Sequence, residues 1–282
     1  MAVKAGEAAR ATRVHEILHR VVQKQSAAKE DRNRWIFGQR ALVRFLRSNG
    51  KLAREELRHY EVRPKVDGME RDLISLEGKV TIGKEVHPYS DPEYRSGKMD
   101  LDGELVDGFA DDFLFEKGAR DGLPKNLFPV SAEMVERHEF TLDGEEDYRG
   151  RQVFRITFVP VKKEGDRPSG WWKGEMLVDT ETLQPLLVTT TQARGIPMAV
   201  RALLGINVKQ MGFRLEYGEV APGVWFPTRY SGEFSLRILF GYSRRIALSL
   251  HNLDFRKATA ESSIQYEGEA KGDELEGRPP VQ

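Results

Sequence analysis

GWWKGEMLVDTETLQPLLVTT, residues 170–190, contains two extended segments separated by a polar turn. The first segment is rich in aromatic and branched apolar side chains and ends at Asp179, and the second begins at Pro185. Short runs of this kind, bounded by turn residues, are typical of β-strands. The intervening TETLQ has the polar composition of a turn. The stretch therefore predicts two antiparallel strands joined by a tight connection.

The same alternation of strands and turns extends over most of the chain. SNGK at 48–51 contains the Asn-Gly pair of a tight hairpin. The predicted strands are 34–47, 52–63, 71–77, 138–144, 151–161, 170–179, 185–193, 209–220, 224–240 and 244–257. Because successive strands follow one another with few helices between them, the order predicts a mainly β, α+β fold built on a strongly curved antiparallel sheet.

Helical signals are few, and the longest covers residues 12–32. A spacing of about 100° per residue places five apolar side chains in one arc: Val14, Ile17, Leu18, Val21 and Val22. We expect this helix to lie across the sheet. A shorter helix is predicted after Ser131, which suits an N-cap.

GIPMAVRALLGI, residues 195–206, is the most apolar stretch of the chain. Pro197 suits the first turn of a short helix and Gly205 its end, while Arg201 leaves one side polar. One interpretation is that this stretch forms a lid over the open side of the sheet and contacts a hydrophobic ligand. The other is that it packs against the sheet as ordinary core.

The predicted organisation is a flexible N-terminus at 1–11, one domain at 12–258 and a disordered acidic tail at 259–282. Within the domain, residues 78–108 are interrupted by glycine and proline, which predicts a long loop or an insertion. No apolar run approaches the roughly 18 residues that span a bilayer. The chain also begins without the apolar region of a secretory signal, as it would if a leader had been removed.

Composition and motifs argue against several functional classes. The 44 basic and 44 acidic residues balance, which does not favour nucleic-acid binding, and the absence of cysteine excludes disulfides and thiolate chemistry. HEILH contains the H-E-x-x-H of zinc peptidases, but His15 and His19 lie at the polar edge of the helix. The acidic clusters at 111–112 and 145–147 lie beside turns, where carboxylates are ordinary.

Residues 170–190 resemble the corresponding hairpin of the LolA-like superfamily, the lipoprotein-sorting and lipid-binding proteins of the bacterial envelope. The likeness is carried by the Gly-Glu-x-x-Val-Asp strand from Gly174 to Asp179 and the turn after it. Residues 140–160 and 217–234 support it, and it extends over roughly residues 12–257. The resemblance implies an unclosed β-barrel whose concave side is covered by the N-terminal helix and short helices.

The resemblance also implies a function, which is non-catalytic binding or transport of a lipid, a lipoprotein acyl chain or another hydrophobic ligand in the periplasm or cell envelope. No cofactor or metal is expected, and an envelope protein is a possible partner. The candidate ligand contacts are Trp171, Trp172, Ile196, Met198, Leu203, Leu204 and Ile206. One alternative is an interaction or structural module whose barrel is filled by Trp35, Phe37, Phe154 and Phe158. Another is a zinc-dependent hydrolase built on His15, Glu16 and His19.

Overall fold

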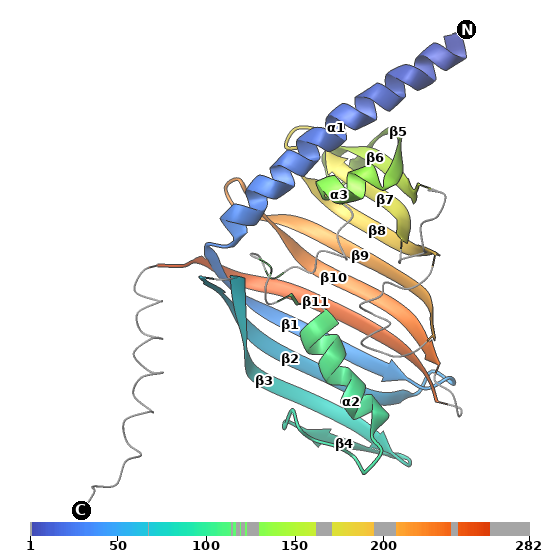
Figure 1. Ribbon diagram of the computed structural model, residues 1–282. Coiled ribbons are helices and arrows are strands. Elements are labelled where there is room, and N and C mark those ends of the chain that lie inside the picture. Colours follow the sequence, from blue (N-terminus) through green and yellow to red (C-terminus); the bar gives the residue numbers. More distant parts are fainter. Residues whose placement is uncertain are drawn as a thin grey trace, which may run out of the picture.

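A single antiparallel sheet organises the chain in a computed structural model (Figure 1). The structure describes residues 2–66, 68–113, 115–116, 119, 122, 130–161, 171–194, 207–237 and 242–259. The strands are β1 (Trp35–Leu46), β2 (Leu52–Lys65), β3 (Gly68–Ile82), β4 (Glu85–Tyr89), β5 (His138–Tyr148), β6 (Arg151–Pro160), β7 (Trp171–Asp179), β8 (Pro185–Arg194), β9 (Asn207–Ala221), β10 (Val224–Arg237) and β11 (Ser243–Lys257). The helices are α1 (Ala2–Arg32), α2 (Leu101–Asp107), the π-helical turn η1 (Gly108–Phe113) and α3 (Ala132–Glu136).

The strand order shows that the sheet is not closed. The eleven strands run β4-β3-β2-β1-β11-β10-β9-β8-β7-β6-β5, so β4 and β5 form its two edges. Neighbours in the sheet are neighbours in the chain except at one place, where β1 pairs with β11. This pairing joins an N-terminal half to a C-terminal half in one continuous sheet. The predicted fold class is therefore confirmed.

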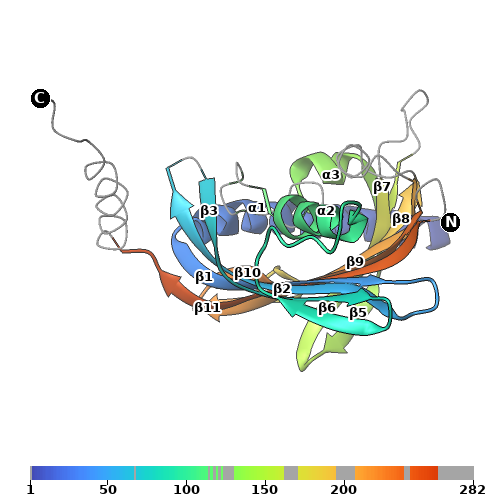
Figure 2. The same ribbon diagram turned by 90° about the horizontal axis from the view of Figure 1, so that it is seen from below.

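The helices all lie on the concave side of the curved sheet. Figure 2 shows the sheet as a trough, with α1, α2 and α3 within its hollow. α1 packs against β5 and β10 and thus crosses the C-terminal half. Its buried apolar side chains include four of the five predicted from the helical spacing, Val14, Ile17, Leu18 and Val21, whereas Val22 is only partly buried. The predicted helix is therefore present, and it begins earlier, at Ala2.

Apolar side chains from the helices and the sheet form the main core on the concave face. Phe109 of η1 packs against Phe45 of β1 and Phe234 of β10, with ring centroids 6.0 and 4.9 Å apart. Leu18 of α1 and Ile156 of β6 belong to the same cluster. Burial of such surface is the main favourable contribution to folding, so the helices are integral to the fold.

Residues 78–108 are not the single long loop that the glycines and prolines predict. They contain the end of β3, all of β4 and the helix α2. Gly78 of β3 faces Tyr89 of β4, whose ring lies where a β-carbon would be, so a larger residue would not fit. Pro88 is tolerated because β4 is an edge strand, which needs hydrogen bonds on one side only. These residues are thus adaptations to a sheet edge.

Two sequence predictions concern segments that the structure does not describe. The apolar stretch at 195–206 lies outside the described residues, and so does the tail from residue 260 onward.

Replacing Leu18 by alanine tests whether α1 is part of the core. Leu18 is completely buried, and such a truncation should lower the free energy of unfolding by about 2–5 kcal/mol because it leaves a cavity. Glu16→Ala on the exposed face of the same helix is the control and should change stability by no more than about 0.5 kcal/mol. Urea unfolding measures both. Equal stability of the two variants would contradict the assigned packing of α1.

Candidate functional site

β2 directs charged side chains toward the concave face. Residues opposite each other on paired strands share a face of the sheet, and Arg54 and Arg58 of β2 pair with Phe45 and Ala41 of β1. Both β1 residues belong to the concave core. The alternation of side chains along a strand places Glu56 on this face as well. Three charged residues therefore lie where apolar ones are usual.

These charges are buried and paired with one another. Arg54 and Glu56 have side chains that are 0% exposed, and they lie 3.2 Å apart between Nη1 and Oε1. Arg58 donates from Nε to the other carboxylate oxygen of Glu56 at 2.8 Å. The hydroxyl of Tyr89 donates to Glu56 at 2.6 Å and accepts from Arg54 at 2.7 Å. Each charge is thus compensated, as burial requires.

The remaining carboxylates come from α2 and η1, which lie above β2. Asp100 caps α2 by accepting from the N–H of Gly103 at 2.9 Å, and its other oxygen pairs with Arg54. Arg58 pairs with Asp107 and donates to Asp111 at 2.9 Å. Arg54 and Arg58 therefore connect the sheet to both ends of the α2–η1 segment.

Two further arginines hold the same segment. Arg71 of β3 donates from Nη2 to Asp111 Oδ1 at 2.9 Å and lies over the ring of Tyr60 at 4.1 Å. Arg244 of β11 donates to both oxygens of Asp102, and Tyr242 donates to the same carboxylate. Ion pairs from β2, β3 and β11 thus surround the segment. We call this set of contacts the arginine–aspartate network.

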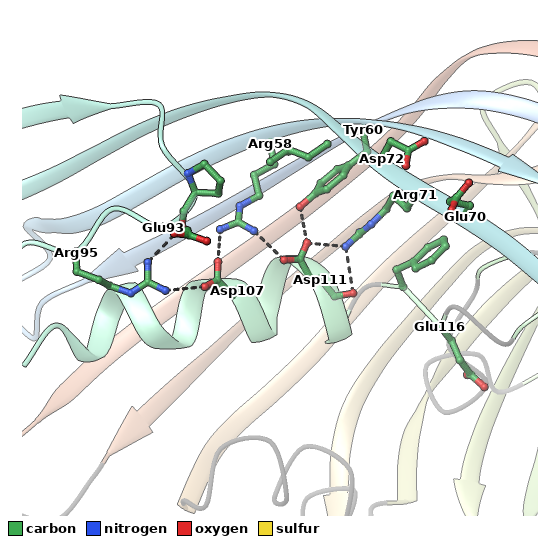
Figure 3. Close-up of a pocket in the computed structure, with 13 residues that line it drawn as sticks. Arg58, Tyr60, Glu70, Arg71, Asp72, Glu93, Arg95, Asp107, Asp111 and Glu116 are labelled. Carbon is green, nitrogen blue, oxygen red and sulfur yellow. Dashed lines mark hydrogen bonds and ion pairs between the residues drawn. The ribbon is translucent and has the colours of Figure 1, made fainter. Parts of the chain in front are cut away.

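A pocket of about 1050 Å³ opens beside the network (Figure 3). Its lining residues come from β2, β3, the segment after β4, α2–η1 and the residues that follow η1: Arg58, Tyr60, Glu70, Arg71, Asp72, Leu73, Pro92, Glu93, Arg95, Asp107, Asp111, Phe115 and Glu116. Six carboxylates and three guanidinium groups line it. Arg63 and Lys65, which lie just outside the lining, pair with Glu70 and Asp72. The positive and negative charges in and around the pocket therefore nearly balance.

The electrostatics keep these groups in their ordinary charge states. Burial opposes the charge of Arg58, but Glu56 and the neighbouring carboxylates outweigh it and raise the pKa of Arg58. Burial would raise the pKa of Asp100, but N–H groups of Ser96 and Gly103 and the charge of Arg54 lower it. Burial raises the pKa of Tyr60, so its hydroxyl stays protonated.

General acid–base catalysis at neutral pH works best with a group whose pKa lies near 7. Among the described residues, each shifted pKa moves away from neutrality, as in Glu216, whose pKa is lowered, and Tyr242, whose pKa is raised. His251 follows the same rule, because burial and the charges of Arg229 and Arg40 lower its pKa. The charged members of the network therefore keep their ordinary charge states, in which they can hold the elements together.

The predicted ligand contacts are only partly within the described structure. Trp172 is buried in the concave core, with its ring 4.9 Å from that of Phe213 in a T-shaped arrangement. Trp171 lies in β7, but its side chain is outside the described residues. The same holds for the other predicted contacts: Ile196, Met198, Leu203, Leu204 and Ile206.

The residues considered for catalysis do not come together in one site. His15, Glu16 and His19 are exposed on α1, and the described part of the chain contains no group of three side chains able to hold a metal ion. Asp111, expected beside a turn, lies in η1 and pairs with arginines. Glu145 pairs with Arg13 of α1 on the surface.

Sequence reasoning missed the arginine–aspartate network. The available signal was the Asn-Gly turn, which determines the register of β1 against β2 and thus places Arg54 opposite Phe45. The alternation within β2 did not reveal it, because both faces of this strand carry charged residues such as Arg54 and Glu55. Nothing in the sequence indicated which carboxylates would meet these arginines.

Comparisons with known proteins find likeness in structure. No family model matches the chain, and no curated protein matches it. The LolA superfamily protein NE2245 from Nitrosomonas europaea is 12% identical, with a TM-score of 0.34 over 87% of this chain and 96% of that chain. A DUF1329 family protein from Desulfovibrio piger is 15% identical, with a TM-score of 0.35 over 93% of this chain and 98% of that chain.

A third solved structure, MucB in complex with MucA(peri), is 11% identical, with a TM-score of 0.22 over 85% of this chain and 100% of that chain. One of these solved structures is a LolA superfamily protein, and residues 170–190 resemble that superfamily. Among the described helices, none combines the length and the apolar character needed to cross a bilayer.

Replacing Arg58 by leucine tests whether the network holds the segment in place. The variant leaves the buried Glu56 and the carboxylates of η1 with fewer positive partners, and loss of one member of a buried pair costs about 3–5 kcal/mol. Arg44→Leu is the matched control, because Arg44 pairs with Glu55 at an exposed site where its side chain is 49% accessible. The control should cost less than about 1 kcal/mol in urea unfolding. Similar losses in both variants would argue against a structural role for the network.

The lowered pKa of Asp100 predicts a dependence of stability on pH. Its carboxylate contributes stability at pH values above the ordinary aspartate pKa of about 3.9, and that contribution is lost as the pH falls through the lower folded-state value. Asp100→Asn retains a side-chain oxygen that can cap α2 but removes the titrating group. Urea unfolding between pH 2 and pH 7 should therefore show a weaker acid dependence in the variant. Parallel curves would contradict the prediction.

Proposed function

We propose that this chain is a non-catalytic binding protein of the bacterial cell envelope. In this proposal it holds a lipid, a lipoprotein acyl chain or another hydrophobic ligand between the concave face of the sheet and the helices above it. The observation that carries the proposal is the apolar concave face of an unclosed sheet, covered by separate helices that pack on it through side chains.

The shape of the sheet supports this proposal. A closed small barrel fills its interior with its own side chains, whereas here the edges β4 and β5 stay apart. The cover is assembled from distant parts of the chain, with α1 on the C-terminal half and α2 near β2. Movement of one cover element would expose apolar surface without breaking the sheet.

The proposed ligand contacts are Trp171 and Trp172 of β7 together with the apolar stretch at 195–206. Within that stretch we assign the contacts to Ile196, Met198, Leu203, Leu204 and Ile206. Met and Leu surfaces adapt to flexible guests. Each buried methylene of an acyl chain would contribute on the order of 0.8 kcal/mol before ordering costs.

The absence of catalysis is also part of the proposal. Its support is the direction of the pKa shifts, which keep the network charged and the buried tyrosines neutral. We further propose that residues 12–258 act as one domain in the periplasm or cell envelope. Its partners would be the hydrophobic ligand and an envelope protein.

A second candidate is an interaction or structural module with a filled interior. Phe37, Phe154 and Phe158, which this alternative requires to be core residues, are 2%, 8% and 1% exposed. Trp35 is partly buried and packs against the smaller cluster around Phe37. If the protein is such a module, its concave side binds no ligand, and its outer surfaces perform the function.

Native mass spectrometry of the purified protein distinguishes the two candidates. A carrier should retain a lipid of defined mass. After removal of that lipid, addition of palmitate or phosphatidylethanolamine should raise the melting temperature, because a ligand that binds only the folded state stabilises it. A filled module should show neither effect.

The double substitution Leu203→Asp with Leu204→Asp tests the assigned contacts. Two carboxylates on the surface that meets the ligand should weaken lipid binding at least tenfold, because an acyl chain cannot compensate their desolvation. Val159→Asp is the control, since Val159 of β6 is already 46% exposed, and it should bind as the unchanged protein does. Equal affinity of all three proteins would remove residues 195–206 from the site.

A further inference from the structure

The convex face of the sheet, opposite the helices, carries three basic side chains on three neighbouring strands. His251 of β11 pairs with Arg40 of β1 on one side and with Arg229 of β10 on the other. Chain neighbours of these residues, such as Ala41 and Leu250, belong to the concave core. The alternation of side chains along a strand therefore directs the three basic residues, which we call the basic row, to the face away from the described helices (Figure 2).

The two arginines of the basic row are exposed and have no partner. Within the described part of the chain, neither Arg40 nor Arg229 makes a hydrogen bond or an ion pair through its guanidinium group. Glu216 lies opposite Arg229 in the register, but its carboxylate pairs with Arg149 and Arg214. A guanidinium group has five N–H donors, and those of the basic row are available to a ligand.

Positive charge exceeds negative charge around the basic row. Four arginines lie in it or beside it: Arg40, Arg149, Arg214 and Arg229. The carboxylates next to them are those of Glu216 and Asp254. Farther along the same face, Arg44 and Lys79 share one carboxylate, so together they offset Glu233. An excess of two positive charges therefore remains, and the basic row favours an anion.

The surroundings of His251 agree with this excess. Burial and the charges of Arg229 and Arg40 lower the pKa of His251, although Asp254 acts in the opposite direction. The imidazole is therefore neutral at pH 7, and its ring N–H can donate to an anion. A bound anion would also offset the repulsion between the two guanidinium groups.

A hollow of about 270 Å³ opens beside the basic row. Its polar lining comes from β9, β10 and β11: Arg214, Glu216, Arg229, Ser231, Ser249 and His251. Ser231 and Ser249 lie opposite each other on adjacent strands, and their short side chains leave room between the longer ones around them. Their hydroxyl groups can also donate hydrogen bonds. The hollow thus offers space for a small anion next to unpaired donors.

We propose that Arg40, His251 and Arg229 bind a phosphate group on the convex face, with Ser231 and Ser249 as further donors. Strands that are two apart in a sheet lie about 10 Å from each other, so the two long arginine side chains can converge on one anion above His251. The tetrahedral oxygens of phosphate can accept from both guanidinium groups and from the imidazole. A carboxylate has only two oxygens, which one arginine can occupy. This site lies on the opposite face of the sheet from the proposed hydrophobic ligand and does not depend on it.

Titration of the full-length protein with inorganic phosphate, followed by NMR of the imidazole resonances, tests the proposal. The resonances of His251 should shift along a saturable curve, and those of His15 on α1 should not follow it. Sodium chloride at the same ionic strength should not reproduce the shift, and acetate should bind more weakly by a factor of about ten or more, since it can satisfy only one of the two arginines. Absence of a shift at His251, or an equal response to chloride or acetate, would overturn the proposal.

Three charge-removing variants locate the phosphate in the basic row. Arg40→Gln and Arg229→Gln should each weaken phosphate binding about tenfold, because a hydrogen bond between charged groups contributes about that factor. Arg245→Gln is the matched control, since Arg245 is exposed on the same face of β11 but is six residues from His251. The control should bind within about twofold of the unchanged protein. Equal weakening in all three variants would show general attraction by the surface charge and would overturn the site.

Vesicles of phosphatidylglycerol distinguish a lipid headgroup from a free phosphate compound. Sedimentation of the unchanged protein and of Arg245→Gln with the vesicles, but not of Arg40→Gln or Arg229→Gln, would assign the phosphate to a headgroup. Failure of all four proteins to sediment, together with the saturable shift of His251, would assign it to a soluble compound. Sedimentation of all four alike, without a phosphate-dependent shift of His251, would overturn the site.

Discussion

The burial of arginine on the concave face is the constraint on which the rest of the structure depends. Arg54 and Glu56 are completely buried, and Arg58 is nearly so. A buried charge is tolerated only when it is paired and hydrogen-bonded, and β2 alone provides one carboxylate for two guanidinium groups on this face. The aspartates of α2 and η1 supply the rest. The sheet therefore requires this segment above it.

The two halves of the concave face are covered in different ways. α1 crosses the C-terminal half through apolar contacts with β5 and β10, whereas α2–η1 is held over the N-terminal half mainly by ion pairs. Phe109 links the two parts, since it belongs to η1 and packs against rings of β1 and β10. Apolar contacts are non-directional and can adapt to a ligand, whereas ion pairs specify one position. The contacts of α1 are thus adaptable, and those of α2–η1 hold it in one position.

Much of the fold followed from local patterns, and the site did not. Turn residues such as Asn49-Gly50 and apolar alternation in β1 are local signals, and the strands and the helix they predict are present. The loop predicted at residues 78–108 was wrong because glycine and proline usually break strands, whereas here Gly78 makes room for Tyr89 and Pro88 lies in an edge strand. The roles of Gly78 and Pro88 depend on the neighbouring strand, which a local sequence pattern does not specify. The partners of Arg58 could not be predicted for the same reason.

The sequence by itself determined the class of the molecule, because strand and helix periods and turn chemistry are properties of short segments. It also determined that one helix would carry an apolar stripe toward a core. Only the tertiary structure decided that Arg54 meets Asp100 and that Arg71 meets Asp111, residues 46 and 40 positions apart. Pairing at such separations is established by the curvature of the sheet and the docking of α2–η1. Charge compensation is a property of the assembled fold, so it cannot be assigned from any single segment.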